Sequence, residues 1–575
     1  MKPTSEQNEA VEKFRTGGSL KINAYAGTGK TTTLQLLAGT SSERGMYLAF
    51  NKSIAQEASE KFPSSVTCST VHSLAFRATP AAYKRNIKKM TDNMNVNAFA
   101  EHLRCEDGWL SGVKITARAQ AHLARETLRH FMQGGRKQID DRHVPDLDHM
   151  GNFAMLPPAD RETLERRAIE GARIMWQRMS DPSDPVPLGH DGYLKLWALS
   201  DPRLSADFIL LDEAQDTNPV VLGVLGKQQS QLVYVGDRHQ QIYEWRGAVN
   251  AMDLAKTDHS TYLTTSFRFG TRIADAASAV LRKLDEKIPL TGNPAVESFI
   301  GVDHPDAILA RTNATVMSSV LEALTAGRNP HIVGGIGELI RMLNGVRDLK
   351  QGRATDIAEF FGFQHWSEVV EFSKLPEGEQ IRTFVSLVES FGEERLINEL
   401  RKTADSEKDA DLIISTAHKA KGREWDCVRL AGDFMPSLPP QAEPDQKPQD
   451  ENDPRSETET GDAKRKGNLA ELRLFYVAMT RARKAIDIEP ATLESFGITK
   501  GTEFKNPRRA RPTPIISAAK YRIDPTPRPR TPTPVSKVPI SKPTPSRQPA
   551  KQESSGGGTI VWILLALAVA YFVFG

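Results

Sequence analysis

The residues best suited to do chemistry lie in the segment AYAGTGKT, at positions 24–31. It matches the phosphate-binding pattern G-x-x-x-x-G-K-[ST], except that Ala24 stands in place of the first glycine. Backbone N–H groups of such a loop bind phosphate oxygens, Lys30 would reach the β- and γ-phosphates, and the Thr31 hydroxyl would bind Mg²⁺. The predicted ATP-binding residues of this loop are Ala26, Gly27, Thr28, Gly29, Lys30, Thr31 and Thr32.

An acidic pair follows the apolar run FILL, in the segment DEAQD at 212–216. After a buried strand, Asp212 would bind Mg²⁺ through water, and Glu213 would act as the general base on the attacking water. An acidic helix cap after a strand is the simpler alternative. Because the phosphate loop and the acidic pair occur together and in the required order, the sequence favours a site that hydrolyses ATP with Mg²⁺.

Parallel strands would have to position these groups, and short apolar runs recur along the chain. They are LKIN at 20, MYLAF at 46, FILLDE at 208, QLVYVGD at 231, AILART at 307 and LIIST at 412. Runs this short and apolar on both faces are typical of buried strands in parallel sheets. Long helix-patterned segments separate them, so the pattern predicts an α/β fold.

Further segments, taken in order, resemble those of superfamily 1 DNA helicases of the UvrD/Rep type. They are TSEQNEAV, AFNKSIAQE, CSTVHSLAFR, DEAQD, VGDRHQQIYEWRGA, LTTSFRFG, ISTAHKAKGREWD and FYVAMTRAR. AFNKSIA, HDGYLKLW and GDRHQQIY are most similar to the F-box DNA helicase branch, although we expect no F-box, because few residues precede the first motif. The resemblance implies two RecA-like P-loop domains with ATP between them, and 3′ to 5′ movement on single-stranded DNA or at a junction with duplex.

The resemblance also implies roles for residues outside the phosphate loop. Arg268 and Arg481 would reach from the second domain to the γ-phosphate, where arginines stabilise charge during phosphoryl transfer. Gln240 would sense the γ-phosphate or the attacking water. Gln7 would contact the edge of the adenine, Phe267 would stack on its face, and Glu424 would contact the ribose. Phe267 could instead be a residue of the hydrophobic core.

Single-stranded DNA would, by the same resemblance, lie on aromatic and polar side chains. Tyr243 and Trp245 are expected to stack on bases, a contact that tolerates any base sequence. The residues expected to contact phosphates or bases are Asn51, Lys52, Thr70, His72, Arg246, Thr416 and His418. The two histidines could instead be core residues, and contacts of these kinds do not distinguish DNA from RNA.

Two departures from the family pattern bear on the activity. Arg238 and His239 replace an acidic pair that is common in UvrD-type proteins, and the second helical insertion is short. Both favour ATP hydrolysis stimulated by single-stranded DNA over unaided duplex unwinding. The main expectation is a helicase of DNA repair, recombination or replication. The first alternative is a translocase that displaces recombinase or other DNA-bound proteins, and the second is a membrane-attached nucleotide-dependent scaffold. The complete hydrolytic set argues against the scaffold.

Composition shifts divide the chain into several expected parts. They are a first RecA-like domain (1–74 and 200–258) with a helical insertion (75–199), a second RecA-like domain (259–329 and 406–495) with a small helical insertion (330–405) and a disordered loop (437–468), a disordered basic Pro-rich linker (496–558) and an apolar tail (559–575). Residues 505–558 hold 12 basic and two acidic residues, whereas the remainder holds 63 basic and 70 acidic. Nucleic acid would therefore bind a local groove rather than the whole surface.

The tail predicts a location. Residues 560–574 are apolar without a charge, and with both neighbours they approach the lower length limit for a transmembrane helix. A soluble core helix is the alternative, but this segment follows a Pro-rich linker and has nothing to pack against. We predict a C-terminal membrane anchor with the catalytic body in the cytosol. The basic linker could bind either DNA or anionic lipid.

Overall fold

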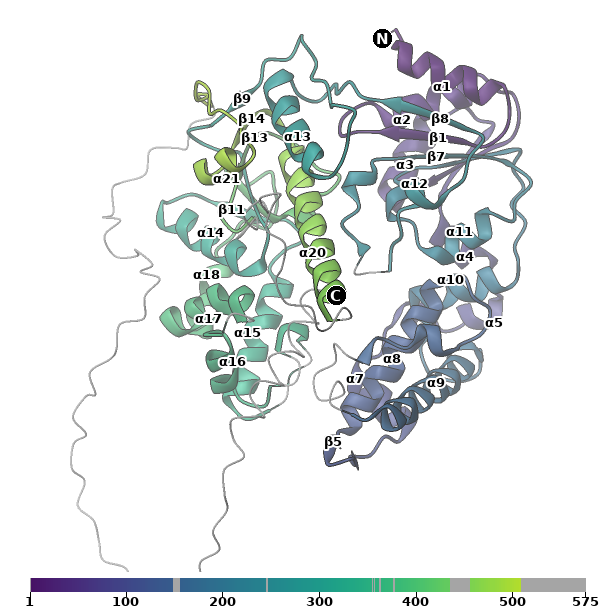
Figure 1. The fold of residues 1–575 in the computed structure, drawn as a ribbon, viewed down its shortest axis with the longest axis vertical. Helices are drawn as coiled ribbons and strands as arrows, with labels where there is room; N and C mark the ends of the chain where they lie inside the picture. The colour runs from purple at the N-terminus through teal and green to yellow at the C-terminus, as the bar shows by residue number, and fades with distance from the viewer. Residues whose placement is uncertain are drawn as a thin grey trace, which may run out of the picture.

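The computed structural model describes most of the chain, in residues 2–147, 156–244, 247–353, 355, 357–360, 363–375, 378–434 and 456–507. These residues form two lobes, each with a sheet at one end and a helical insertion at the other (Figure 1). The first lobe contains the phosphate loop and the acidic pair, and the second contains Arg481. A nucleotide site that uses all of them must therefore lie between the lobes.

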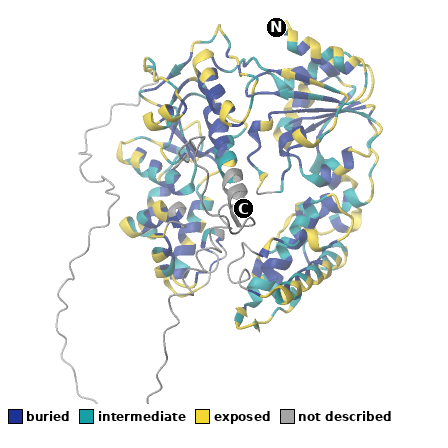
Figure 2. Cartoon of the chain, in the orientation of Figure 1, coloured by how far each residue is buried: buried dark blue, intermediate teal, exposed yellow. Residues whose placement is uncertain are grey.

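The first sheet has six parallel strands in the order β3-β2-β6-β7-β1-β8. Its strands are β1 (Leu20–Ala24), β2 (Gly45–Ala49), β3 (Val66–Thr70), β6 (Phe208–Leu211), β7 (Gln231–Gly236) and β8 (His259–Leu263). Every residue of β2 and β6 is buried, as expected for strands covered on both faces (Figure 2). Strand β8 corrects one predicted boundary, because it pairs with β1 although its residues were assigned to the second domain.

The second sheet also has six parallel strands, in the order β11-β12-β10-β13-β14-β9. They are β9 (Phe299–Ile300), β10 (Ala307–Ala310), β11 (Pro330–Ile332), β12 (Leu412–Thr416), β13 (Trp425–Leu430) and β14 (Ala482–Asp487). The predicted α/β class with parallel sheets is therefore confirmed. In both sheets a strand from beyond the helical insertion pairs with strands from before it, so each insertion interrupts a sheet without dividing it.

Helices of the first sheet cover it on both faces. They are α1 (Ser5–Arg15), α2 (Lys30–Gly39), α3 (Lys52–Lys61), α4 (Val71–Ala78), α11 (Pro219–Leu225) and α12 (Ala251–Leu254). Phe14 of α1 and Leu34 of α2 are buried in one core with Leu20, Ile22 and Phe208 of the strands. This core fixes the start of α2, which carries Lys30, relative to the ends of β1 and β6.

The first insertion contains six helices and a short hairpin among its described residues. These are α5 (Ala81–Lys84), α6 (Ile87–Thr91), α7 (Val96–Leu103), β4 (Gly108–Leu110), β5 (Val113–Ile115), α8 (Ala117–Gln133), α9 (Pro158–Ser180) and α10 (Gly189–Leu199). Leu128 and Phe131 of α8 share a core with Met175 of α9 and Ile209 of β6. The insertion is thus packed against the sheet through a continuous apolar core.

The second lobe contains helices that pack on its sheet and helices that form its small insertion. They are α13 (Thr271–Lys283), α14 (Asn313–Thr325), α15 (Gly337–Lys350), α16 (Trp366–Phe372), α17 (Glu379–Phe391), α18 (Glu393–Leu400), α19 (Ala417–Ala420), α20 (Ser456–Met479) and α21 (Pro490–Ser495). Leu343, Phe384 and Leu396 of the insertion share a core with Ile414 of β12. Buried residues of α13 and α20 form a second core on the other side of the sheet.

Part of the predicted disordered loop at 437–468 is helical. Residues 437–455 lie outside the described part of the chain, but Ser456 begins α20, which continues to Met479. The segment after Ser456 contains Glu, Ala, Lys and Arg, which favour helix, and it leads into the buried run LRLFYVAM. The prediction judged this segment by its polarity and overlooked the buried helix that it continues.

The predicted membrane location is contradicted. Across the part of the chain that the structure describes, no helix is long and apolar enough to cross a membrane. Residues 559–575, on which the predicted anchor depended, and residues 508–558 of the linker lie outside that part. The apolar length of the tail was at the lower limit for a span, so the sequence supported the anchor only weakly.

Candidate ATPase site and nucleic-acid track

The phosphate loop connects β1 to α2 through two glycines with left-handed backbone. Gly27 has φ +74° and Gly29, the N-cap of α2, has φ +80°. A Cβ on Gly27 would lie 2.5 Å from Ser266 Oγ, so a larger residue does not fit there. Ala24, by contrast, is the buried last residue of β1 and has no positive φ. The position of the expected first glycine therefore does not require glycine.

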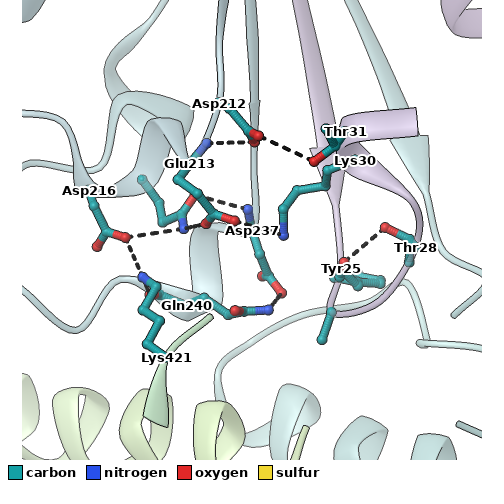
Figure 3. A network of polar contacts seen from close by, with 12 residues as sticks. Tyr25, Thr28, Lys30, Thr31, Asp212, Glu213, Asp216, Asp237, Gln240 and Lys421 are labelled. Atoms are coloured by element: carbon teal, nitrogen blue, oxygen red, sulfur yellow. Dashed lines mark hydrogen bonds and ion pairs between the residues drawn. The ribbon is translucent and has the colours of Figure 1, made fainter. Parts of the chain in front are cut away.

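The acidic pair lies directly opposite the start of α2. Asp212 Oδ2 accepts hydrogen bonds from Thr31 Oγ1 at 3.5 Å and from the Tyr47 hydroxyl at 2.6 Å. Lys30 Nζ lies 3.5 Å from Glu213 Oε1, and the two side chains point toward each other (Figure 3). Thr31 and Asp212, the two predicted Mg²⁺ ligands, are thus neighbours, although they are 181 positions apart in the sequence.

Burial and charge separate the two carboxyl groups. Burial and the adjacent Glu213 raise the pKa of Asp212 above its ordinary value. Burial also acts to raise the pKa of Glu213, but the ammonium groups of Lys30 and Lys421 outweigh it and hold that pKa below its ordinary value. Glu213 is therefore ionised at neutral pH, as a general base must be.

The predicted arginines of the second lobe lie at the interface between the lobes. Arg268 Nε contacts Glu424 Oε2 at 2.6 Å and its Nη1 donates to the Thr480 carbonyl at 2.9 Å. Arg481 is 2% exposed, and its Nη2 donates to Gln240 Oε1 of the first lobe at 3.3 Å. Burial and nearby Arg268 lower the pKa of Arg481 to about 9, so its guanidinium remains charged at neutral pH.

Gln240 is held by groups from both lobes. It ends the 3-10 helix η5 (Arg238–Gln240), and its Nε2 donates to Asp237 Oδ2 at 2.8 Å. The Tyr476 hydroxyl of α20 donates to the same carboxylate oxygen at 3.0 Å and accepts from the Ala26 N–H of the phosphate loop at 3.5 Å. A change in the phosphate loop would therefore affect the contact between Gln240 and Arg481.

Lys421 is a second link between the lobes, and the sequence prediction missed it. Its Nζ forms an ion pair with Asp216 (Figure 3). The same nitrogen donates to the Gln240 carbonyl at 2.6 Å and lies 5.2 Å from the centre of the Tyr243 ring. Asp216 is itself buried, and burial raises its pKa to about 6 although Lys421 is adjacent. Both residues belong to motifs that the prediction used, but it considered only the first two acids of DEAQD.

Of the three residues predicted to contact adenine and ribose, Gln7 and Phe267 lie against the phosphate loop. Gln7 Nε2 donates to Thr33 Oγ1 at 3.2 Å, while its Oε1 accepts the Thr4 N–H at 3.1 Å. A Cβ on Gly29 would lie 3.4 Å from both Gln7 Nε2 and the Phe267 ring. Glu424 instead pairs with Arg268, as described above. Thr32, predicted to bind ATP from the phosphate loop, is exposed on α2, and its side chain makes no hydrogen bond within the described part of the chain.

Three of the predicted DNA contacts are N-caps of helices that follow strands. The side chains of Asn51, Thr70 and Thr416 accept backbone N–H groups of α3, α4 and α19 at 2.9, 3.1 and 3.3 Å. Lys52 is the exposed first residue of α3. These residues therefore lie at the carboxyl ends of β2, β3 and β12, where ligands of parallel α/β sheets bind.

The aromatic part of the predicted track lies between the lobes. Tyr243 donates its hydroxyl to the His418 carbonyl at 3.1 Å, and its ring is parallel to that of Phe50 at a centroid distance of 5.9 Å. Phe50 is 48% exposed, and an unusually exposed aromatic beside Asn51 is a signal that the prediction overlooked. A cavity of about 710 Å³ reaches from these rings past Thr70 and His72 to the acidic pair. Trp245 and Arg246 lie outside the described residues.

Comparison with known proteins agrees with this arrangement. Residues 7–246 match a family model described as an AAA domain, and residues 339–489 match the UvrD-like helicase C-terminal domain. F-box DNA helicase 1 of Gallus gallus is 31% identical over 84% of the chain and 49% of its own length. F-box DNA helicase protein 1 of Schizosaccharomyces pombe is 27% identical over 87% of the chain and 58% of its own length.

The chain resembles UvrD/Rep-type helicases over most of its length. The predicted resemblance, including its F-box DNA helicase branch, is confirmed. The chain spans about half the length of the curated relatives it matches. The ATP-dependent DNA helicase PcrA of Leuconostoc citreum is 34% identical over 14% of this chain, so that likeness is limited to a short segment.

The two residues that depart from the family pattern have defined partners in the structure. Arg238 Nη2 lies 2.9 Å from Asp253 Oδ1, and His239 Nε2 lies 2.9 Å from Glu286 Oε2. Tyr25 of the phosphate loop reaches the same segment, because its hydroxyl donates to the Ile288 carbonyl at 2.7 Å. His239 therefore connects the loop that contains Gln240 to the segment after α13, where an acidic residue would be repelled by Glu286.

Proposed function

We propose that this protein hydrolyses ATP between its two sheet domains and uses the energy to move 3′ to 5′ along single-stranded DNA, in DNA repair, recombination or replication. The observation that carries the proposal is the pair of contacts across the cleft, Arg481 with Gln240 and Lys421 with Asp216. Both join the second lobe to residues beside Glu213. Hydrolysis there would change the distance between the lobes.

The chemistry follows from the side chains around the phosphate loop. Gly27 and Gly29 would leave backbone N–H groups free for the phosphates, and Lys30 would neutralise their charge. Thr31 and Asp212 fit Mg²⁺, since one hydroxyl and one carboxylate oxygen already lie together, and the ion would supply further charge neutralisation. Ionised Glu213 would accept the proton of the attacking water.

The second lobe would complete the site only when the cleft closes. Arg268 and Arg481 would bring two positive charges to the phosphoryl group, the form of stabilisation that arginines supply in phosphoryl transfer. Gln7 and Phe267 would contact the adenine, and Glu424, released from Arg268, the ribose. Loss of the γ-phosphate removes the group that both arginines would bind, so the lobes would then separate.

Movement of the lobes would be passed to nucleic acid through Lys421 and Tyr243. Lys421 contacts the acidic segment, the Gln240 backbone and the Tyr243 ring at once. Stacked aromatic rings bind any base, as a motor that moves along any sequence needs. Thr70 and Thr416, one in each lobe, would bind the strand at two points whose separation changes with each hydrolysis cycle.

One ATPase experiment tests the proposal. Turnover is measured with single-stranded DNA, single-stranded RNA and no nucleic acid, for the wild type, Lys30→Ala, Glu213→Gln and the partly exposed control Lys13→Ala. We expect DNA to stimulate the wild type and the control, and the two site variants to lose roughly 10²-fold or more. Wild-type turnover that DNA leaves unchanged would overturn the motor. Polarity follows from partial duplexes with only a 3′ or only a 5′ tail.

We infer a second candidate function from Arg238 and His239, namely displacement of recombinase or other proteins from single-stranded DNA with little unwinding. Both side chains contact carboxylates within the protein, Arg238 in an ion pair and His239 in a hydrogen bond, so neither is available to a duplex. A forked duplex and a protein-coated single strand, compared at equal ATP turnover, distinguish the candidates. Efficient unwinding of the fork would exclude the second one.

A further inference from the structure

Four basic side chains form a surface beside the first DNA-contact turn. They are Arg77, Lys84, Arg85 and Lys88, here called the α4–α6 basic patch. Three are exposed and Lys84 is half-buried. Within the described ranges of the chain none of the four forms an ion pair, whereas exposed Arg44, Lys137 and Arg353 each pair with an aspartate. The patch therefore has uncompensated positive charge.

The patch is joined to the predicted track by direct contacts. Arg77 Nη2 donates to Ser69 Oγ at 2.9 Å, and Ser69 precedes Thr70, the N-cap at the end of β3. Lys84 Nζ donates to the Arg77 carbonyl at 2.9 Å and lies 5.6 Å from the centre of the Phe76 ring. Helices α4 and α5 follow one another along this side of the first lobe (Figure 1).

Two anchors hold the helices of the patch in place. The Tyr83 hydroxyl donates to the Ser180 carbonyl at 2.5 Å. Lys89 is buried, and its Nζ donates to the carbonyls of Asp184 and Val186 at 2.7 and 2.8 Å. The neighbouring Lys88 is exposed and makes no such contact within the described residues. A surface that is held in this way loses little entropy when it binds an extended chain of phosphates.

We propose that the α4–α6 basic patch binds the phosphate backbone of single-stranded DNA where the strand leaves the turn at Thr70. Outside residues 505–558 the chain has more acidic than basic residues, so the protein as a whole does not attract a polyanion. The α4–α6 basic patch, which adjoins the track, supplies the local positive charge that binding of a phosphate backbone requires. The patch has charge but no exposed aromatic ring, so it would hold phosphates without reading bases. This inference rests on the proposed function, because it extends the same track.

Charge reversal and strand length together test the patch. Arg85→Glu/Lys88→Glu changes two exposed residues whose side chains make no hydrogen bond within the described residues. The matched control is Arg15→Glu/Lys256→Glu, at exposed positions near the amino ends of β1 and β8, the opposite edge of the sheet. Binding is measured at several salt concentrations with oligonucleotides of roughly 8 and roughly 24 nucleotides, a range that brackets single binding platforms.

We expect the patch variant to bind the long strand about tenfold more weakly than the control and the short strand equally well. For the patch variant, the slope of the logarithm of the binding constant against the logarithm of the salt concentration should fall in magnitude by about 0.7 for each lost phosphate contact. Equal binding of the long strand by both variants would overturn the inference, and so would a loss confined to duplex DNA. Failure of the wild type to bind either strand would instead refute the proposed function. Thermal melting confirms that both variants are folded.

Discussion

The two lobes each present one turn of the same design to the nucleic-acid track. Residues 69–72 and 415–418 both read Ser-Thr-x-His, and in each the threonine caps the following helix. The serine hydroxyl donates to the carbonyl of that threonine at 3.3 Å in the first turn and 2.9 Å in the second. Two lobes of different sequence have thus placed equal donors at the carboxyl ends of β3 and β12.

The two histidines differ, and the difference separates their roles. His72 packs edge-on against Tyr193 of the first insertion at 6.0 Å, and burial lowers its pKa. His418 faces the other lobe, where its carbonyl accepts the Tyr243 hydroxyl. The first turn is therefore fixed within its own lobe, whereas the second is attached across the cleft. We infer that the second turn is the one whose environment changes when the lobes move.

Removing Arg268 tests most strongly whether the second lobe is needed for hydrolysis. We expect Arg268→Ala to lower ATP turnover by about 10³-fold, because an arginine that reaches the transferred phosphoryl group contributes at least that much. Steady-state ATPase at saturating single-stranded DNA measures the effect. Nucleotide binding should be reduced much less, since the phosphate loop belongs to the first lobe. Turnover within tenfold of the wild type would place the function of Arg268 elsewhere.

Lys421 tests the attachment of the second turn. Lys421→Met leaves the Asp216 carboxylate buried beside Glu213, and breaking one half of a buried ion pair costs about 3 kcal/mol or more. Thermal unfolding and DNA-stimulated turnover should both be impaired.

The double variant Asp216→Asn/Lys421→Met is the control, because it removes both charges together. It should regain most of the melting temperature but not the stimulation by DNA. If stimulation also returns, Lys421 acts only through stability.

Substitutions of Thr70 and Thr416 test whether the two Ser-Thr-x-His turns are functionally equivalent. We expect Thr70→Ala and Thr416→Ala each to cost about 1 kcal/mol of stability through loss of the cap, and each to weaken binding of single-stranded DNA. Thr70→Ser and Thr416→Ser keep the hydroxyl and should retain both properties. Equal effects of the two alanine variants on binding would support equivalent contacts, whereas an effect of one alone would show that the likeness is limited to the fold.

The smallest expected effect concerns His239 and Glu286. The hydrogen bond from His239 lowers the pKa of Glu286 from 4.5 to about 2. A carboxyl group whose pKa is lower in the folded than in the unfolded protein stabilises the fold at pH values above its unfolded-state pKa. This stabilisation is lost as the pH falls from 4.5 toward 2. Glu286→Gln should therefore cost about 1 kcal/mol near pH 7, and less as the pH falls below 4.5. Denaturant midpoints at several pH values check this; a difference that does not depend on pH would contradict it.

Strands that are apolar on both faces could be predicted, whereas the edge strands β3 and β8 of the first sheet could not. The predicted runs all became strands, including the fully buried β2, β6 and β12. Strands β3 and β8, with sequences VTCST and HSTYL, are the two edges of the first sheet and have exposed positions. Their polar residues hide them from a search for apolar runs, because only one side of each is paired.

The candidate site shows a similar limit. A short local pattern identified Lys30, Thr31 and the acidic pair, whose partners are fixed by strands β1 and β6. Lys421 could not be identified in this way, because its function depends on Asp216 and Tyr243 of the other lobe, which only the tertiary structure brings near. Three predicted contacts proved to be helix caps, a property that is compatible with phosphate binding but that motif matching alone did not reveal.

The interrupted first sheet has a consequence for how the chain is made. Strand β2 ends at Ala49, but β6, its neighbour in the sheet, begins only at Phe208. During synthesis from the N-terminus, the edge of β2 therefore waits unpaired while the whole first insertion emerges from the ribosome. An unpaired edge of an entirely buried strand is prone to pair with other chains. Chains released before residue 208 should aggregate, whereas those released after β8 can complete the sheet.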